Sequence, residues 1–232
     1  MPHLDRDGVK IHYESHGDGP VVLLSHGYTA TTEMWRGQIA PLTSAGYRVV
    51  VWDMRGHGAS DSPEDDALYS EAATMADMAA VLDAVEADRA VIGGLSLGGY
   101  MSLAFNIAHP DRVRALMLFD TGPGFRKDEA RDGWNANAIR TGEKLGDGLA
   151  RAARGMLVQH DARVIDSLPT IPVPTLVLIG ENDTPFVAGT DYMAAKIPTA
   201  TKVVIADAGH AANIDQPAAF NDAVLAFLGG LG

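Results

Sequence analysis

Short runs of apolar residues alternate along the chain with longer segments whose apolar residues recur at helical intervals. The runs at 20–25, 47–52 and 113–119 are rich in aliphatic side chains, as buried strands are. The segments at 34–45 and 71–87 have helical spacing. Strands that alternate with helices in this way predict an α/β fold, in which helices flank a mainly parallel central sheet.

The same alternation continues through the rest of the chain. We expect strands at 89–95, 173–179 and 201–206, and helices at 97–108, 186–196 and 216–228. Residues 9–15 alternate between apolar and polar positions, which predicts a half-exposed strand that pairs with residues 2–5 in a hairpin. Because ligands of such sheets bind at the carboxyl ends of the strands, residues just after each strand are the candidates for chemistry.

The stretch from Ala90 to Ala108 contains no charged residue and is long enough to suggest a membrane-spanning helix. Glycines and polar residues interrupt it, and it divides better into a buried strand at 89–95 and a helix at 97–108. A fully buried parallel strand is a continuous apolar run, so the missing charge does not require lipid. Ser96 then lies at the turn between the two elements.

Glycines surround this serine at the positions that a sharp turn requires. Gly94 and Gly98 lie two residues before and two residues after Ser96, giving the pattern G-x-S-x-G. Side chains at those positions would collide across a tight strand-to-helix turn, and glycine removes the collision. The pattern and its position are typical of a nucleophile elbow, which presents a serine hydroxyl above a sheet. The alternative is a flexible glycine loop that contains a serine.

Composition and charge narrow the class of protein. The chain has 232 residues, of which 47% are hydrophobic, which suits one large domain or one domain with an insertion. It has no cysteine, and no histidine and carboxylate cluster has the spacing of metal ligands, so we expect no metal and no cofactor. The net charge of −12 disfavours nucleic acid and anionic membranes as partners. The first ten residues contain no apolar signal region, which favours a cytoplasmic location.

A serine, an acid and a histidine follow three of the predicted strands in that order. They are Ser96, Asp183 and His210. A serine hydroxyl is a poor nucleophile unless a base takes its proton, and the base needs an acid that fixes its tautomer. Histidine suits the role of base because it titrates near neutral pH. These three residues are therefore the candidate catalytic triad.

Together with these residues, several short motifs make the sequence similar to the α/β-hydrolase superfamily. They are His26-Gly27 after an early strand, residues 53–60 (DMRGHGAS), the Ser96 elbow, residues 180–183 (GEND) and residues 208–210 (AGH). The resemblance covers nearly the whole chain and implies the α/β-hydrolase fold. It also implies an oxyanion hole formed by the backbone amides of Tyr28 and Leu97, and structural roles for His26 and His57.

The resemblance leaves one rival for the acid. Asp120 ends the strand at 113–119, and some members of the superfamily take their acid from that position. We favour Asp183, because a carboxylate in this later loop is the commoner pattern. The serine at the elbow also disfavours epoxide hydrolases and haloalkane dehalogenases, whose nucleophile is aspartate.

The superfamily places its cap in the segment that corresponds to residues 121–168. We expect a short helical cap there and a core formed by residues 1–120 and 169–232. Helices are predicted at about 126–139 and 143–158, the second with an apolar stripe from Leu145 to Met156. The predicted substrate-binding residues are Tyr28, Phe125, Trp134 and Met156.

The resemblance implies a serine hydrolase of the carboxylesterase type, which cleaves a small to medium ester through an acyl-enzyme intermediate. Its partner would be a small-molecule substrate, and the sequence does not decide the oligomeric state. Lactones, thioesters, carbon–carbon bonds next to ketones and acyl transfer to alcohol or peroxide use the same triad in this superfamily. Some members serve instead as ligand receptors with little turnover, since fold does not imply function.

Overall fold

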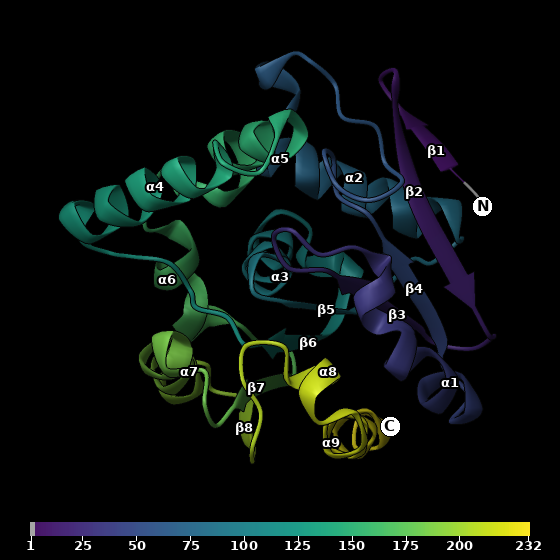
Figure 1. Cartoon of the computed structure of the whole chain (residues 1–232). Helices are drawn as coiled ribbons and strands as arrows, with labels where there is room; N and C mark the ends of the chain where they lie inside the picture. The colour runs from purple at the N-terminus through teal and green to yellow at the C-terminus, as the bar shows by residue number, and fades with distance from the viewer. Residues whose placement is uncertain (1–2) are drawn as a thin grey trace.

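An eight-stranded, mostly parallel sheet forms the centre of the computed structural model, which describes residues 3–232 (Figure 1). The strands are β1 (His3–Arg6), β2 (Val9–His16), β3 (Val21–Ser25), β4 (Arg48–Trp52), β5 (Ala90–Leu95), β6 (Val113–Phe119), β7 (Thr175–Gly180) and β8 (Ala200–Ile205). Their order across the sheet is β1-β2-β4-β3-β5-β6-β7-β8. β1 and β2 pair antiparallel, β2 and β4 pair antiparallel, and all later neighbours are parallel.

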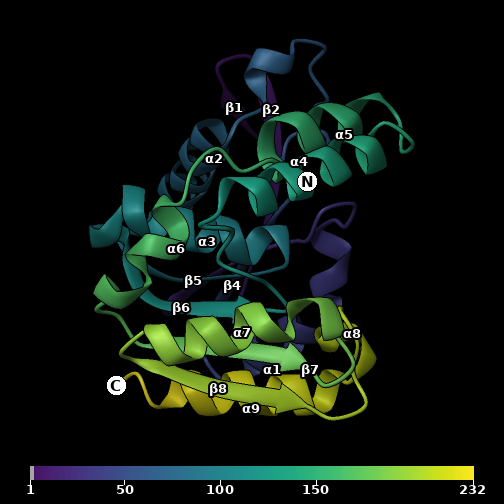
Figure 2. The ribbon, with the colours of Figure 1, turned by 90° about the vertical axis from the view of Figure 1, so that its left-hand side faces the viewer.

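Helices cover both faces of the sheet. One face carries α2 (Glu71–Ala84), α3 (Leu97–Ala108) and α7 (Thr184–Lys196), and the other carries α1 (Arg36–Ser44), α8 (Ala212–Asp215) and α9 (Pro217–Gly229) (Figures 1 and 2). Successive strand residues alternate between the two cores: Ile92 belongs to the first and Val91 to the second. Short 3₁₀ turns lie at η1 (Thr32–Trp35), η2 (Asp66–Leu68) and η3 (Pro110–Arg112).

The sequence pattern predicts this architecture correctly, with the ends of the core elements shifted by up to three residues. The predicted 97–108 helix and 113–119 strand are present with the same bounds. The predicted N-terminal hairpin is present as β1 and β2, in which His3 lies opposite His12, while its residue 2 lies outside the described residues. No helix in the described part of the chain has the length and apolar character that a membrane crossing requires.

Between β6 and β7 the chain forms a group of helices and turns, of which α4 and α5 are seen at the upper left of Figure 1. They are α4 (Asp128–Gly142), α5 (Asp147–Ala152), the π-helical turn η4 (Ala153–Leu157), α6 (Arg163–Ser167) and the 3₁₀ turn η5 (Leu168–Thr170). α4 pairs with α5 and η4, and η4 also contacts α2. The division of the chain into a core and a cap at residues 121–168 stays a prediction.

One predicted helix in this segment is present only in part, as α5 and η4 over residues 147–157. The expected helix at 143–158 begins only at Asp147, because Gly146 before it has a positive φ of 100°. Leu145, the first residue of the expected apolar stripe, is 43% exposed. Farther along, η4 packs tightly on the chain before α2. A Cβ placed on Gly155 would lie 2.1 Å from the carbonyl oxygen of Tyr69, so this close contact requires glycine.

Candidate active site

The turn that carries Ser96 has the geometry of a nucleophile elbow. Ser96 links β5 to α3 with φ 55° and ψ −114°, a left-handed conformation that non-glycine residues rarely adopt. A Cβ on Gly98 would lie 2.2 Å from the carbonyl oxygen of Ser25, and one on Gly94 would lie 2.5 Å from the backbone of Gly98. Both glycines are therefore required by close backbone approach, which rules out a loosely structured glycine loop.

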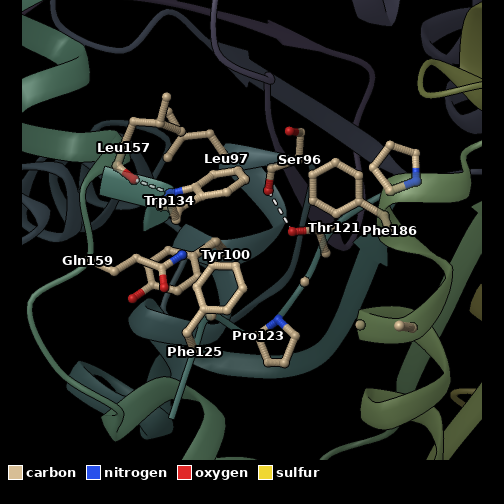
Figure 3. Close-up of a pocket in the computed structure, with 15 residues that line it drawn as sticks. Ser96, Leu97, Tyr100, Thr121, Pro123, Phe125, Trp134, Leu157, Gln159 and Phe186 are labelled. Atoms are coloured by element: carbon tan, nitrogen blue, oxygen red, sulfur yellow. Dashed lines mark hydrogen bonds between the residues drawn. The ribbon is translucent and has the colours of Figure 1, made fainter. Parts of the chain in front are cut away.

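Two hydrogen bonds hold the elbow against the end of β6. The Ser96 amide donates to the carbonyl of Phe119 at 2.9 Å. The Thr121 hydroxyl donates to the carbonyl of Ser96 at 2.7 Å, as the dashed line in Figure 3 shows. Strained backbone persists only where the surrounding structure fixes it, and these bonds supply part of that support.

His210 and Asp183 form a hydrogen-bonded pair. The Nδ1 atom of His210 lies 2.8 Å from Oδ2 of Asp183. Asp183 follows β7 and is 3% exposed, whereas the side chain of His210, in the loop after β8, is 45% exposed. A carboxylate partner makes Nδ1 the donor and leaves Nε2 as a proton acceptor. The ring of Phe186 stacks on the imidazole with centroids 4.8 Å apart.

Asp120, the rival acid, is engaged elsewhere. It is fully buried, and its Oδ1 accepts a hydrogen bond from the Gly180 amide at 2.8 Å. Burial raises the pKa of the Asp120 carboxyl to about 8, and the nearby charge of Asp183 acts in the same direction. The hydrogen-bond geometry therefore pairs His210 with Asp183. The raised pKa makes Asp120 a largely neutral group at pH 7.

The loop after β3 lies directly against the elbow. A Cβ placed on Gly27 would be 3.5 Å from the Cβ of Ser96. His26 fixes this loop, because its Nε2 accepts from the Met54 amide at 2.9 Å and its Nδ1 donates to the Gly27 carbonyl at 2.7 Å. Burial lowers the pKa of His26 to about 4, so the ring is neutral at pH 7.

The two amides that the resemblance assigns to an oxyanion hole are free to donate. Leu97 is the first residue of α3, where amides have no partner within the helix. Within residues 3–232, neither the Leu97 amide nor the Tyr28 amide donates to another group of the chain. A helix N-terminus also favours negative charge, which suits an oxyanion.

The segment at 53–60 shapes a turn. Asp53 accepts from the amides of Thr32 at 2.7 Å and Ala59 at 2.9 Å. His57 donates from Nδ1 to the Arg55 carbonyl at 3.0 Å, and burial lowers its pKa to about 3. These contacts fit the structural role that the resemblance implies for His57. Within the described range no group of three or more histidine, aspartate or glutamate side chains is arranged to hold a metal ion.

A cavity of about 240 Å³ opens beside Ser96 and is bounded mainly by apolar side chains (Figure 3). Phe125 and Trp134 line it, with ring centroids 5.8 Å apart. The indole of Trp134 also donates to the carbonyl of Leu157 at 3.0 Å. The cavity also includes Phe186, from α7, and Gln159, from the loop after η4, which the sequence pattern did not indicate.

The structure does not place the other two predicted substrate-binding side chains in this cavity. The hydroxyl of Tyr28 donates to the carbonyl of Leu149 at 2.7 Å, which turns the side chain toward α5. Met156 is 1% exposed and packs in the hydrophobic core beneath η4. Its helical spacing marked an apolar face, and that face meets the core rather than the cavity.

Solved structures with this architecture include hydrolases. A thermophilic esterase from Thermogutta terrifontis has a TM-score of 0.87 and 28% identity, with 100% of this chain and 99% of the esterase covered. The enol-lactonase from Burkholderia xenovorans LB400 has a TM-score of 0.83 and 25% identity, with 98% of this chain and 100% of the lactonase covered.

Sequence relatives and a family model agree with this likeness. The epoxide hydrolase of Caballeronia sordidicola is 37% identical over 110 residues, which cover 47% of this chain and 33% of the relative, so the match spans about a third of that protein. The family model described as alpha/beta hydrolase fold matches residues 20–167, a range that includes the Ser96 elbow. Since that match spans more than half of the chain and the sheet has the same architecture, the chain belongs to the α/β-hydrolase family.

Proposed function

We propose that this protein is a serine hydrolase that cleaves a small to medium carboxylic ester. The observation that carries the proposal is the strained, braced Ser96 at the mouth of an apolar cavity, in a chain that also holds the His210–Asp183 pair. A nucleophile, a base with an orienting acid and an acyl site are the parts that ester hydrolysis through an acyl-enzyme needs.

In the proposed reaction, the Ser96 oxygen attacks the ester carbonyl while His210 accepts the serine proton at Nε2. The amides of Tyr28 and Leu97 donate to the oxyanion of the tetrahedral intermediate; one such donor is worth on the order of 3 kcal/mol. The carbon–oxygen bond to the alcohol then breaks, and His210 gives its proton to the leaving oxygen. Water, deprotonated by His210, attacks the acyl carbon, the bond from that carbon to the Ser96 oxygen breaks, and His210 returns the proton to Ser96 as the acid leaves.

The cavity supports a small acyl group. Its volume of about 240 Å³ lies below the range of roughly 300–1,000 Å³ that holds drug-sized ligands. The aromatic rings of Phe125 and Trp134 close it on the side of α4, which limits the length of an acyl chain. We therefore expect short acyl groups to be cleaved faster than long ones.

A lactone is the second candidate substrate, because it is a cyclic ester that the same steps would open. The likeness to the enol-lactonase over the whole chain supports this candidate. Epoxide opening is not proposed, although epoxide hydrolases are among the relatives, because the elbow residue is serine where that branch uses aspartate.

A substrate panel tests the proposal. Methyl esters and 4-nitrophenyl esters of graded acyl length, a set of lactones and matched amides would be compared by kcat/KM. We expect multiple turnover of esters with two to six acyl carbons and loss of that turnover in Ser96→Ala. The control Ser102→Ala removes another buried hydroxyl of α3 and should keep most of the activity. A single turnover or none would favour the receptor alternative, and turnover that persists in Ser96→Ala would contradict the mechanism.

A further inference from the structure

A buried polar side chain in the cavity beside Ser96 has an atom with no hydrogen-bond partner among residues 3–232. Gln159 is 7% exposed and lines the cavity, and its Oε1 atom is buried with no hydrogen-bond partner within the described residues. Buried polar groups are almost always hydrogen-bonded, so an unpaired carboxamide at a binding site calls for a partner from outside the chain. In Figure 3 the Gln159 side chain is drawn among the residues that line the cavity.

The fold does not need this carboxamide in order to position the residue. The backbone of Gln159 is fixed by Asn135 of α4, whose Nδ2 donates to the Gln159 carbonyl at 2.7 Å and whose Oδ1 accepts from the Gln159 amide at 2.8 Å. Gly124 leaves room for the side chain, since a Cβ there would lie 2.7 Å from Oε1 of Gln159. The main chain therefore holds the residue. Oε1 packs against Gly124, and Nε2 of the carboxamide, which has no acceptor among the described residues, is the polar atom that can meet a ligand directly.

The lining indicates the chemistry of the missing partner. Phe125, Trp134 and Leu157 are apolar neighbours, and no charged side chain lines the cavity within residues 3–232. A charged ligand group would be buried there without a counter-ion, which is unfavourable. A hydroxyl fits best, because it can accept from Nε2 and can also donate to Oε1 if the carboxamide rotates by half a turn.

We propose that Gln159 is a specificity-determining residue that selects esters whose acyl group carries a hydroxyl. The inference rests on the proposed ester hydrolysis at Ser96 and names its substrate class. The hydroxyl pairs with the Gln159 carboxamide while the apolar part of the acyl chain packs on Phe125 and Trp134. An acyl group of the same shape without a hydroxyl leaves the carboxamide unpaired, and a site built to pair a polar group rejects such an analogue.

Matched pairs of methyl esters test the proposal. Each pair replaces a hydroxyl by a methyl group of similar size: 3-hydroxybutanoate with 3-methylbutanoate, 4-hydroxypentanoate with 4-methylpentanoate, and 5-hydroxyhexanoate with 5-methylhexanoate. For at least one pair we expect kcat/KM to favour the hydroxy ester by about tenfold or more in the unmodified protein. Chromatography of the remaining ester, the carboxylic acid and any lactone, against a blank without protein, measures both members of each pair, because 4- and 5-hydroxy acyl groups can also leave as lactones.

The variant Gln159→Met keeps the length of the side chain and removes its hydrogen bonds. We expect it to lower the hydroxy-to-methyl ratio of kcat/KM about tenfold, while turnover of the methyl-substituted ester stays equal or rises. The control Leu157→Met changes an apolar neighbour in the same cavity and should keep the ratio. If alkyl esters are cleaved at Ser96 and the ratio is the same in both proteins, this inference is overturned and the proposed function stands. If no ester of either kind is turned over, both are overturned.

Discussion

His210 and Asp183 are joined by a hydrogen bond of 2.8 Å between Nδ1 and Oδ2, across the loops that follow β8 and β7. Asp120 lies one strand away and binds the Gly180 amide instead. This division of roles between two neighbouring carboxyl groups leads to distinct expectations for the corresponding asparagine variants.

Asp183→Asn should lower kcat by about 10⁴, because an amide in place of the carboxylate leaves His210 in the wrong tautomer. Asp120→Asn should lower kcat by less than about tenfold, since an asparagine can still accept the Gly180 amide. Steady-state kinetics on one reactive ester compares the two variants directly. The opposite ranking would move the catalytic acid to the end of β6.

The raised pKa of Asp120 predicts a pH dependence of stability. In the unfolded chain this carboxyl ionises near pH 4, whereas in the folded protein it stays protonated up to about pH 8. The contribution of this carboxyl to the stability of the fold is therefore fully present below about pH 4 and is lost as the pH rises toward 8. A pKa unit is worth about 1.4 kcal/mol. From pH 5 to pH 8 the unmodified protein should therefore lose on the order of 2–4 kcal/mol more of its free energy of unfolding than Asp120→Asn does.

Urea unfolding at the two pH values measures that difference. The buried, neutral His26 and His57 have lowered pKa values and destabilise the fold on acidification, but they do so equally in both proteins and cancel in the comparison. An effect of Asp120→Asn that is the same at pH 5 and pH 8 would show that the carboxyl is ionised in the folded protein.

Thr121→Val should weaken the support of the elbow, because valine has nearly the size and shape of threonine but no hydroxyl. The valine cannot donate to the Ser96 carbonyl, so we expect a loss of about 1 kcal/mol in the free energy of unfolding. Because the orientation of Ser96 also relaxes, kcat should fall by roughly tenfold. Thr121→Ser keeps the hydroxyl and serves as the control. Equal kinetics for the valine and serine variants would argue that the bond does not position the nucleophile.

Trp134→Ala should shift the substrate preference toward esters with longer acyl chains. The indole closes the cavity and is held by its bond to the Leu157 carbonyl, so its removal extends the space beside Phe125. We expect the acyl length with the highest kcat/KM to increase, with a smaller effect on melting temperature than a core truncation, since α4 buries only Ala138 and Gly142. A sharply lowered melting temperature with unchanged acyl preference would make Trp134 a structural residue.

The nucleophile elbow could be predicted because its requirements are local. Gly94 and Gly98 are demanded by contacts within a few residues of Ser96 and with the adjacent β3, and the flanking strand and helix have clear hydrophobic patterns. The pairing of His210 with Asp183 followed from the order of strands, since the carboxyl ends of parallel strands meet at one edge.

The cavity was harder to predict because its lining depends on packing between distant segments. Helical spacing marked Met156 as apolar but could not tell whether that face meets the cavity or the core. The chain at 158–162 has no periodic pattern, and the availability of Gln159 depends on its distant partner Asn135. Positive φ at Gly146 is likewise a property of the folded turn, which is why the helix there begins later than predicted.

Covalent labelling shows whether Ser96 is the nucleophile. The unmodified protein, Ser96→Ala and the control Ser102→Ala would each be treated with a fluorophosphonate, and the modified residue located by peptide mass spectrometry. We expect one phosphonylated site at Ser96 in the unmodified protein and in Ser102→Ala, and no labelling in Ser96→Ala. Labelling that persists at another serine in Ser96→Ala, or an unlabelled Ser96 in a protein that hydrolyses esters, would contradict the assignment of Ser96 as the nucleophile.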